Sequence, residues 1–124
     1  MKLSHQPLIS IIDDDRSVRE ATNGLVRSLG YATAVFASAE EYLQSDHVPG
    51  TSCVITDLHM PGLSGTDLQS RLIAEGRDIP VIIVTAYSDE TTRAQALDAG
   101  AIAFLSKPFS EECLIECLDK ALKC

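Results

Sequence analysis

The chain has 124 residues, of which 45% are hydrophobic and 23% are charged, with a formal net charge of −8. These totals fit one globular domain spanning residues 1–124 and exclude a disordered chain. The excess of acids disfavours direct nucleic-acid binding, and no apolar run is long enough to span a bilayer. Because the first residues lack the apolar core of a secretory signal, we expect a cytoplasmic location.

Short apolar runs alternate with amphipathic segments five times along the chain. The apolar runs are rich in Val, Ile and Ala, which is typical of strands buried on both faces of a parallel sheet. We expect strands at residues 8–13, 32–36, 52–56, 80–84 and 101–105. We expect helices at residues 16–29, 38–46, 65–75, 90–99 and 110–122.

Small polar residues mark the ends of several expected helices. Asp15, Ser38, Ser64 and Ser110 precede helices and are predicted N-caps, because their side-chain oxygens can accept hydrogen bonds from the first turn. Gly30 follows the first helix and is predicted at the position just past its end, which favours glycine.

The regular alternation predicts a doubly wound α/β fold. Right-handed crossovers place helices on both faces of one parallel sheet. The expected architecture is an open, flavodoxin-like (βα)5 sheet with strand order 2-1-3-4-5. In such sheets a site forms at the carboxyl ends of the strands where their order reverses, here between the first and third strands.

Carboxylates gather at this predicted edge. Asp13 and Asp14 directly follow the first apolar run, and Asp57 directly follows the third. Like charges at the end of a buried strand are costly unless a cation neutralises them. Because carboxylate oxygens suit a hard divalent cation, the sequence predicts a Mg²⁺ site here.

The last two expected strands also end in reactive groups, a hydroxyl at Thr85 and an ammonium at Lys107. The edge therefore combines the three acids with these two side chains. The set Asp13, Asp14, Asp57, Thr85 and Lys107, in this order and at strand ends, resembles the receiver domain of two-component response regulators. This resemblance covers nearly the whole chain.

Shorter motifs are similar to the nitrogen-fixation regulators of the FixJ type. They are Gly30-Tyr31, the sequence Phe-Ala-Ser-Ala-Glu at residues 36–40, and Met-Pro-Gly-Leu-Ser-Gly at residues 60–65. Members of that subgroup usually carry a LuxR-type DNA-binding domain after the receiver. The resemblance therefore implies a receiver cut from a longer transcription regulator, and a complete single-domain regulator is the other possibility.

The resemblance also assigns roles to the acids. Asp57 would accept a phosphoryl group from a sensor histidine kinase. Asp13, Asp14 and Asp57 would hold Mg²⁺ together with the backbone carbonyl of His59. Asp14 would be a direct ligand, and Asp13 would act partly through water.

The remaining strand-end residues would bind and report the phosphoryl group. Thr85 and Lys107 would each contact a phosphoryl oxygen, and the Lys107–Pro108 bond is expected to be cis. Phe104 matches the family's switch aromatic and would rotate as Thr85 moves inward. The altered face, made of the fourth helix, fifth strand and fifth helix, would bind a partner, so a phosphorylation-dependent homodimer is expected.

Two rings are expected to flank the phosphoryl group. His59 and Tyr87 each lie two residues after a site residue, at positions that tune access of hydrolytic water in this family. We expect these rings to slow loss of the phosphoryl group.

Other functions on the same fold fit the sequence less well. An interaction module that works without phosphorylation would not need Asp57, Thr85 and Lys107 together. An aspartyl-phosphate hydrolase would place a second acid where this chain has His59. We therefore expect a signalling switch, which catalyses only its own phosphorylation and dephosphorylation, rather than an enzyme.

Overall fold

Five parallel strands form a single sheet in this computed structural model, which describes residues 7–86 and 89–122. The strands are β1 (Leu8–Ile12), β2 (Ala32–Phe36), β3 (Cys53–Asp57), β4 (Val81–Thr85) and β5 (Ala103–Ser106). Their order is β2-β1-β3-β4-β5, as predicted. Because Ile12 pairs with Thr56, the residues that follow β1 lie beside the end of β3.

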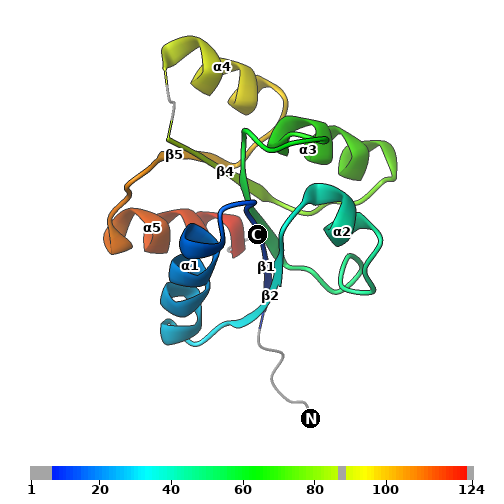
Figure 1. Cartoon of the computed structure of the whole chain (residues 1–124). Coiled ribbons are helices and arrows are strands. Elements are labelled where there is room, and N and C mark those ends of the chain that lie inside the picture. Colours follow the sequence, from blue (N-terminus) through cyan, green and yellow to red (C-terminus); the bar gives the residue numbers. More distant parts are fainter. Residues whose placement is uncertain (1–6, 87–88, 123–124) are drawn as a thin grey trace.

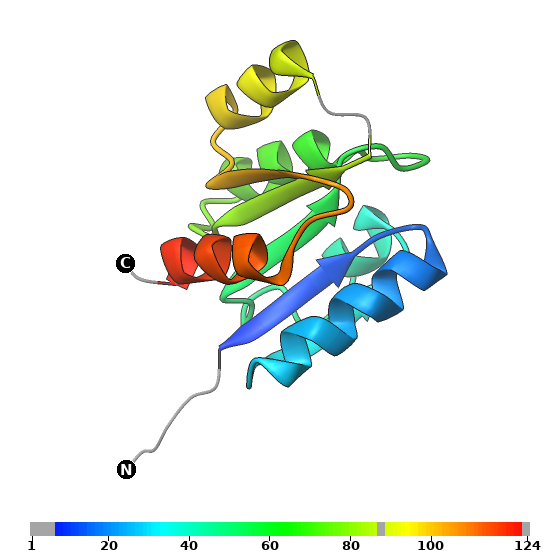
Figure 2. The ribbon, with the colours of Figure 1, turned by 90° about the vertical axis from the view of Figure 1, so that its left-hand side faces the viewer.

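Helices cover both faces of this sheet, which confirms the doubly wound fold. They are α1 (Arg16–Ser28), α2 (Ala39–Leu43), α3 (Gly65–Ala74), α4 (Glu90–Asp98) and α5 (Glu111–Leu122). Helices α1 and α5 lie on one face, and α2, α3 and α4 lie on the other (Figures 1 and 2). No helix in the described ranges is long and apolar enough to cross a membrane.

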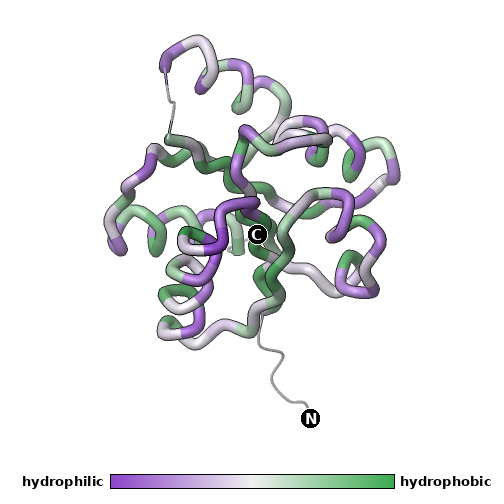
Figure 3. Tube along the Cα trace, viewed as in Figure 1, coloured by the Kyte–Doolittle hydropathy of each residue, from purple (hydrophilic) through white to green (hydrophobic). Residues whose placement is uncertain are grey.

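An apolar cluster lies on each side of the sheet. On one side Val26 of α1 and Leu114 of α5 pack with Ile9 and its strand neighbours. On the other side Tyr42 and Leu68 pack against the opposite faces of the strands. Hydrophobic residues accordingly concentrate along the central strands (Figure 3). Burying one such side chain contributes about 1.5–3 kcal/mol, so this packing holds the strand ends in place.

The predicted helix ends are confirmed. Asp15, Ser38, Ser64 and Ser110 each accept a hydrogen bond from the backbone N–H three residues later, at 3.0 to 3.2 Å. Gly30 follows α1 with a φ of +98°, a conformation that side chains rarely adopt. These local signals could be read in the sequence because each depends on neighbouring residues alone.

One predicted helix was too long. The sequence predicts a helix over residues 38–46, but α2 ends at Leu43. The Ser45 hydroxyl donates to the carbonyl of Tyr42 at 2.6 Å, and the His47 backbone N–H donates to the Ser45 hydroxyl at 3.2 Å. Serine thus replaces the helical hydrogen bonds with a turn. The other predicted elements differ from the structure by at most two residues at either end.

Candidate functional site

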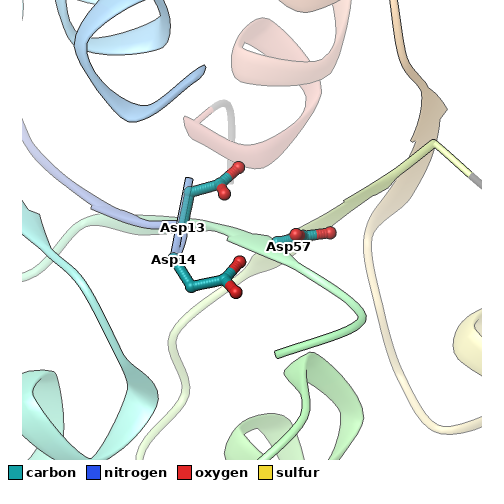
Figure 4. A group of neighbouring side chains, drawn as sticks. All are labelled: Asp13, Asp14 and Asp57. Carbon is teal, nitrogen blue, oxygen red and sulfur yellow. The ribbon is translucent and has the colours of Figure 1, made fainter. Parts of the chain in front are cut away.

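Three carboxylates meet at the carboxyl edge of the sheet (Figure 4). Asp13 and Asp14 follow β1, and Asp57 ends β3. One oxygen of each carboxylate lies within 4.8 Å of the other two. Asp13 is only 5% exposed, whereas Asp14 lies on the exposed rim. The structure therefore brings together the three acids that the sequence predicts as a cluster.

Lys107 adds one positive charge to this cluster. Its Nζ donates to Oδ2 of Asp13 at 2.9 Å and lies 3.5 Å from Oδ2 of Asp57. The backbone N–H of Lys107 donates to the carbonyl of Thr85 at 2.8 Å, which ties the end of β5 to the end of β4. The Lys107–Pro108 bond is cis, as predicted.

The site contains more negative than positive charge. Burial and the charge of Asp13 raise the pKa of Asp57. The charge of Lys107 lowers this pKa, but the net shift is upward. Burial by itself would lower the pKa of Lys107, but the hydrogen bond and charge of Asp13 and the charge of Asp57 raise it overall. Three carboxylates against one ammonium form a donor set that fits a hard divalent cation.

The backbone around Asp13 is fixed by two further hydrogen bonds. Its Oδ1 accepts from the N–H of Asp15 at 2.9 Å, and its carbonyl accepts from Nη1 of Arg19 at 2.7 Å. The sequence does not single out Arg19, because an arginine in a first helical turn is usually solvated. Its role depends on the helix folding back toward the end of β1.

Gly65, at the start of α3, ends the motif at residues 60–65, but the sequence did not predict it as a residue that shapes the site. A Cβ at this position would lie 2.7 Å from the carbonyl oxygen of Asp57. The N–H of Gly65 donates to the carbonyl of Leu58 at 3.0 Å, so α3 begins directly behind the acidic residue. A signal was available, since glycine is a poor residue in the first turn of a helix.

Thr85 and His59, two of the remaining predicted residues, lie at this edge. Thr85 ends β4 and is fully buried. His59 is exposed in the loop after β3, and its backbone N–H is hydrogen-bonded to Asp57. Phe104 is half-buried in β5 and packs against the cluster on the α2–α4 face. Tyr87 lies outside the described residues.

Comparison with known proteins gives consistent matches. Residues 9–119 match the family model of the response regulator receiver domain. The chain is 40% identical over 118 residues to response regulator protein TmoT of Ectopseudomonas mendocina, covering 95% of this chain and 54% of that protein. It is 36% identical over 117 residues to transcriptional regulatory protein FixJ of Bradyrhizobium diazoefficiens, covering 93% and 56%. The chain thus spans about half the length of the curated relatives it matches.

Solved structures share the whole fold. The crystal structure of FixJ-N superimposes with a TM-score of 0.86 at 30% identity, covering 97% of this chain and 96% of that one. The response regulator StyR superimposes with a TM-score of 0.87 at 37% identity, covering 96% of this chain and 60% of that one. With the acidic cluster at the predicted edge, these matches show that the chain belongs to the response regulator receiver domain family.

Proposed function

We propose that Asp57 is the phosphoacceptor of this receiver domain and that a sensor histidine kinase is the donor. The observation that carries this proposal is the position of Asp57. It ends a central strand, shares the edge with Asp13 and Asp14, and lies 3.5 Å from the ammonium of Lys107. A nucleophilic carboxylate, acidic metal ligands and a cation for phosphoryl oxygens are the groups that phosphoryl transfer needs.

The proposed transfer uses the Asp57 side chain as the nucleophile. One carboxylate oxygen forms a bond to phosphorus as the P–N bond of a phosphohistidine breaks. The electron pair of that bond passes to the imidazole nitrogen, which takes up a proton. Gly65 packs against the backbone carbonyl of Asp57, and the strands on either side of β3 hold Asp57 in position. The Asp57 side chain therefore needs little reorganisation before it reacts.

Asp13, Asp14 and Asp57 would hold Mg²⁺, together with the backbone carbonyl of His59. When bound, Mg²⁺ supplies positive charge that offsets repulsion among the acids and the incoming phosphoryl group. Lys107 is bound to Asp13 in the structure and would exchange this partner for a phosphoryl oxygen.

The buried hydroxyl of Thr85 would donate to another phosphoryl oxygen. Inward movement of Thr85 would let Phe104 rotate and change the face formed by α4, β5 and α5. We propose that this face controls dimerisation or an output domain. Names of the relatives support a transcriptional output, since several are transcriptional regulatory proteins.

A groove beside the site offers a docking surface for the kinase. It has a volume of about 540 Å³ and runs between α1 and the segment that leads into α5. Val18, Ala21 and Leu25 line one side, and Pro108 and Phe109 line the other, next to Lys107. Its mainly apolar walls suit a helix from a partner.

Membership of a kinase-dependent family also supports a cytoplasmic location.

Intact-mass measurement after incubation with Mg²⁺ and acetyl phosphate tests the proposed acceptor. We expect one added phosphoryl group on the wild type and none on Asp57→Asn. An adduct on both proteins would mean that another residue is the nucleophile. If neither protein is modified, even by a cognate kinase, the domain acts as an interaction module that does not use phosphorylation.

A further inference from the structure

Two segments that are far apart in the sequence meet beside the phosphoacceptor. Glu40, in the first turn of α2, accepts at Oε2 a hydrogen bond from the backbone N–H of Leu63 at 3.1 Å. Leu63 lies in the β3–α3 loop, residues 58–64, which begins directly after Asp57 and includes His59. A side chain of α2 therefore holds the backbone of the loop that leaves the phosphoacceptor.

The loop is shaped to receive this carboxylate. Gly62 has a φ of +79°, a conformation that favours glycine. Any Cβ at position 62 would collide with Oε2 of Glu40. The side chains of Met60 and Leu63 pack against the apolar cluster on the same face of the sheet. Backbone conformation, packing and the Glu40 hydrogen bond thus favour one arrangement of the loop.

Stability alone does not explain a glutamate at this position. Its second oxygen, Oε1, is buried and has no hydrogen-bond partner among the described residues. A buried carboxylate oxygen without a partner costs free energy. Glu40 therefore makes its hydrogen bond to Leu63 even though burial of its other carboxylate oxygen, Oε1, is unfavourable.

We propose that Glu40 is a positioning residue for the phosphoacceptor site. By holding the N–H of Leu63, Glu40 would keep the β3–α3 loop in one arrangement and so fix the position of His59, whose backbone carbonyl would bind Mg²⁺. Glu40 itself is not part of the acidic cluster. The inference rests on the proposed function, because it requires the His59 carbonyl to be a metal ligand.

The neighbouring residue Glu41 is a matched control. Its Oε1 accepts a hydrogen bond from the backbone N–H of Ala37 at 2.8 Å, which caps the start of α2. Removing either carboxylate takes one negative charge and one hydrogen bond from the same turn. Only removal of the Glu40 carboxylate breaks the link to the β3–α3 loop.

Calorimetric titration of the metal-free chain with Mg²⁺ tests the proposal. We expect Glu40→Ala to weaken Mg²⁺ binding about tenfold, the lower end of the range for residues that orient metal ligands. Glu40→Asp keeps the charge but is one methylene too short, so it should weaken binding similarly. Glu40→Gln loses the charge but keeps an acceptor oxygen, so its affinity should stay close to wild type, as should that of Glu41→Ala.

The other outcomes would contradict either the proposed function or the positioning role of Glu40. Absence of Mg²⁺ binding to the wild type would overturn the proposed function itself. Wild-type affinity in Glu40→Ala and Glu40→Asp, or an equal loss in Glu41→Ala, would overturn the positioning role alone. If Glu40→Ala fails to fold, hydrogen exchange of the Leu63 amide decides. We expect faster exchange in Glu40→Asp than in wild type and Glu41→Ala, and equal rates in all three would contradict the proposal.

Discussion

Asp57 occupies a position that is unfavourable for a charged carboxylate. Burial and the charge of Asp13 raise its pKa above the ordinary value of 3.8, although Lys107 partly opposes this shift. Below the ordinary value the group is protonated in both the folded and the unfolded chain, so it has no effect on stability. As pH rises through the higher folded pKa, ionisation of Asp57 costs more free energy in the folded chain than in the unfolded chain. The protein therefore loses stability, and the loss persists at neutral pH.

Replacing Asp57 with asparagine should therefore stabilise the metal-free protein at pH 7. A gain of roughly 1 kcal/mol corresponds to about 4 °C in melting temperature for a domain of this size. The gain should shrink as pH falls toward 4, because the wild-type carboxylate then becomes protonated. Thermal unfolding in EDTA between pH 4 and 7.5 measures this, with Asp119→Asn as an exposed control. A gain that does not change with pH would contradict the electrostatic explanation.

The residues that could be predicted from sequence share one property. Asp13, Asp57 and Lys107 each lie within two residues of the end of an apolar run, and the ends of parallel strands must converge. Arg19 and Glu40 were not predicted as site residues, because their roles depend on distances between elements. Nothing in a local pattern distinguishes a helical glutamate that holds a loop from one that faces solvent.

The start of α3 shows how closely one element is fitted to the site. Gly65 leaves no space for a side chain, since a Cβ would lie 2.7 Å from the carbonyl oxygen of Asp57. We expect Gly65→Ala to destabilise the domain by about 1–3 kcal/mol through this overlap. It should also slow phosphorylation by acetyl phosphate, because the carbonyl belongs to Asp57, the proposed phosphoacceptor.

Gly24 in α1 provides the opposite control for this substitution. No atom lies within 4 Å of a Cβ built at Gly24. Alanine should therefore favour the helix and stabilise the domain by about 0.4–1 kcal/mol. Urea unfolding of both variants measures the two free energies. The same sign for both would mean that space around Gly65 is not the controlling factor.

Among the helices, α4 has the fewest buried residues. Ala96 is its only fully buried residue, and the helix lies at one edge of the molecule beside β5 (Figure 1). An element with little buried apolar surface can shift at small cost in free energy. This property suits the proposal that the face made of α4, β5 and α5 changes on phosphorylation. The sequence predicted the existence of α4, but its loose attachment emerged only from the packing.

The site is a consequence of the topology of the whole molecule. The order β2-β1-β3-β4-β5 reverses between β1 and β3, so helices leave these strands toward opposite faces. That divergence leaves the strand ends accessible, with Asp13 and Asp57 on adjacent strands. Strand–helix alternation predicted a doubly wound sheet, and right-handed crossovers left few strand orders to choose from. Tertiary contacts between a helix and a loop, such as that between Glu40 and Leu63, are not constrained by the topology.

The acidic cluster exists only in the folded chain, since the sheet brings Asp13, Asp14 and Asp57 together from two strands. A cation that binds there must therefore stabilise the whole fold. At a Mg²⁺ concentration one hundred times the dissociation constant, the gain is about 2.7 kcal/mol, which corresponds to about 10 °C in melting temperature. Asp14→Ala should remove most of this gain. Because Asp14 is exposed, the stability of the metal-free protein should change little.

Asp13→Ala is a less direct test, because Asp13 also binds Lys107 at 2.9 Å and the N–H of Asp15. Its loss would remove an ion pair together with a metal ligand. Thermal unfolding of wild type and Asp14→Ala, in EDTA and in Mg²⁺ at constant ionic strength, separates metal binding from screening of surface charge. Equal gains in the two proteins would mean that Mg²⁺ acts elsewhere. In that case no bound cation would offset the repulsion among the acids at the ends of β1 and β3. Asp57 would then lack the positive charge that phosphoryl transfer requires.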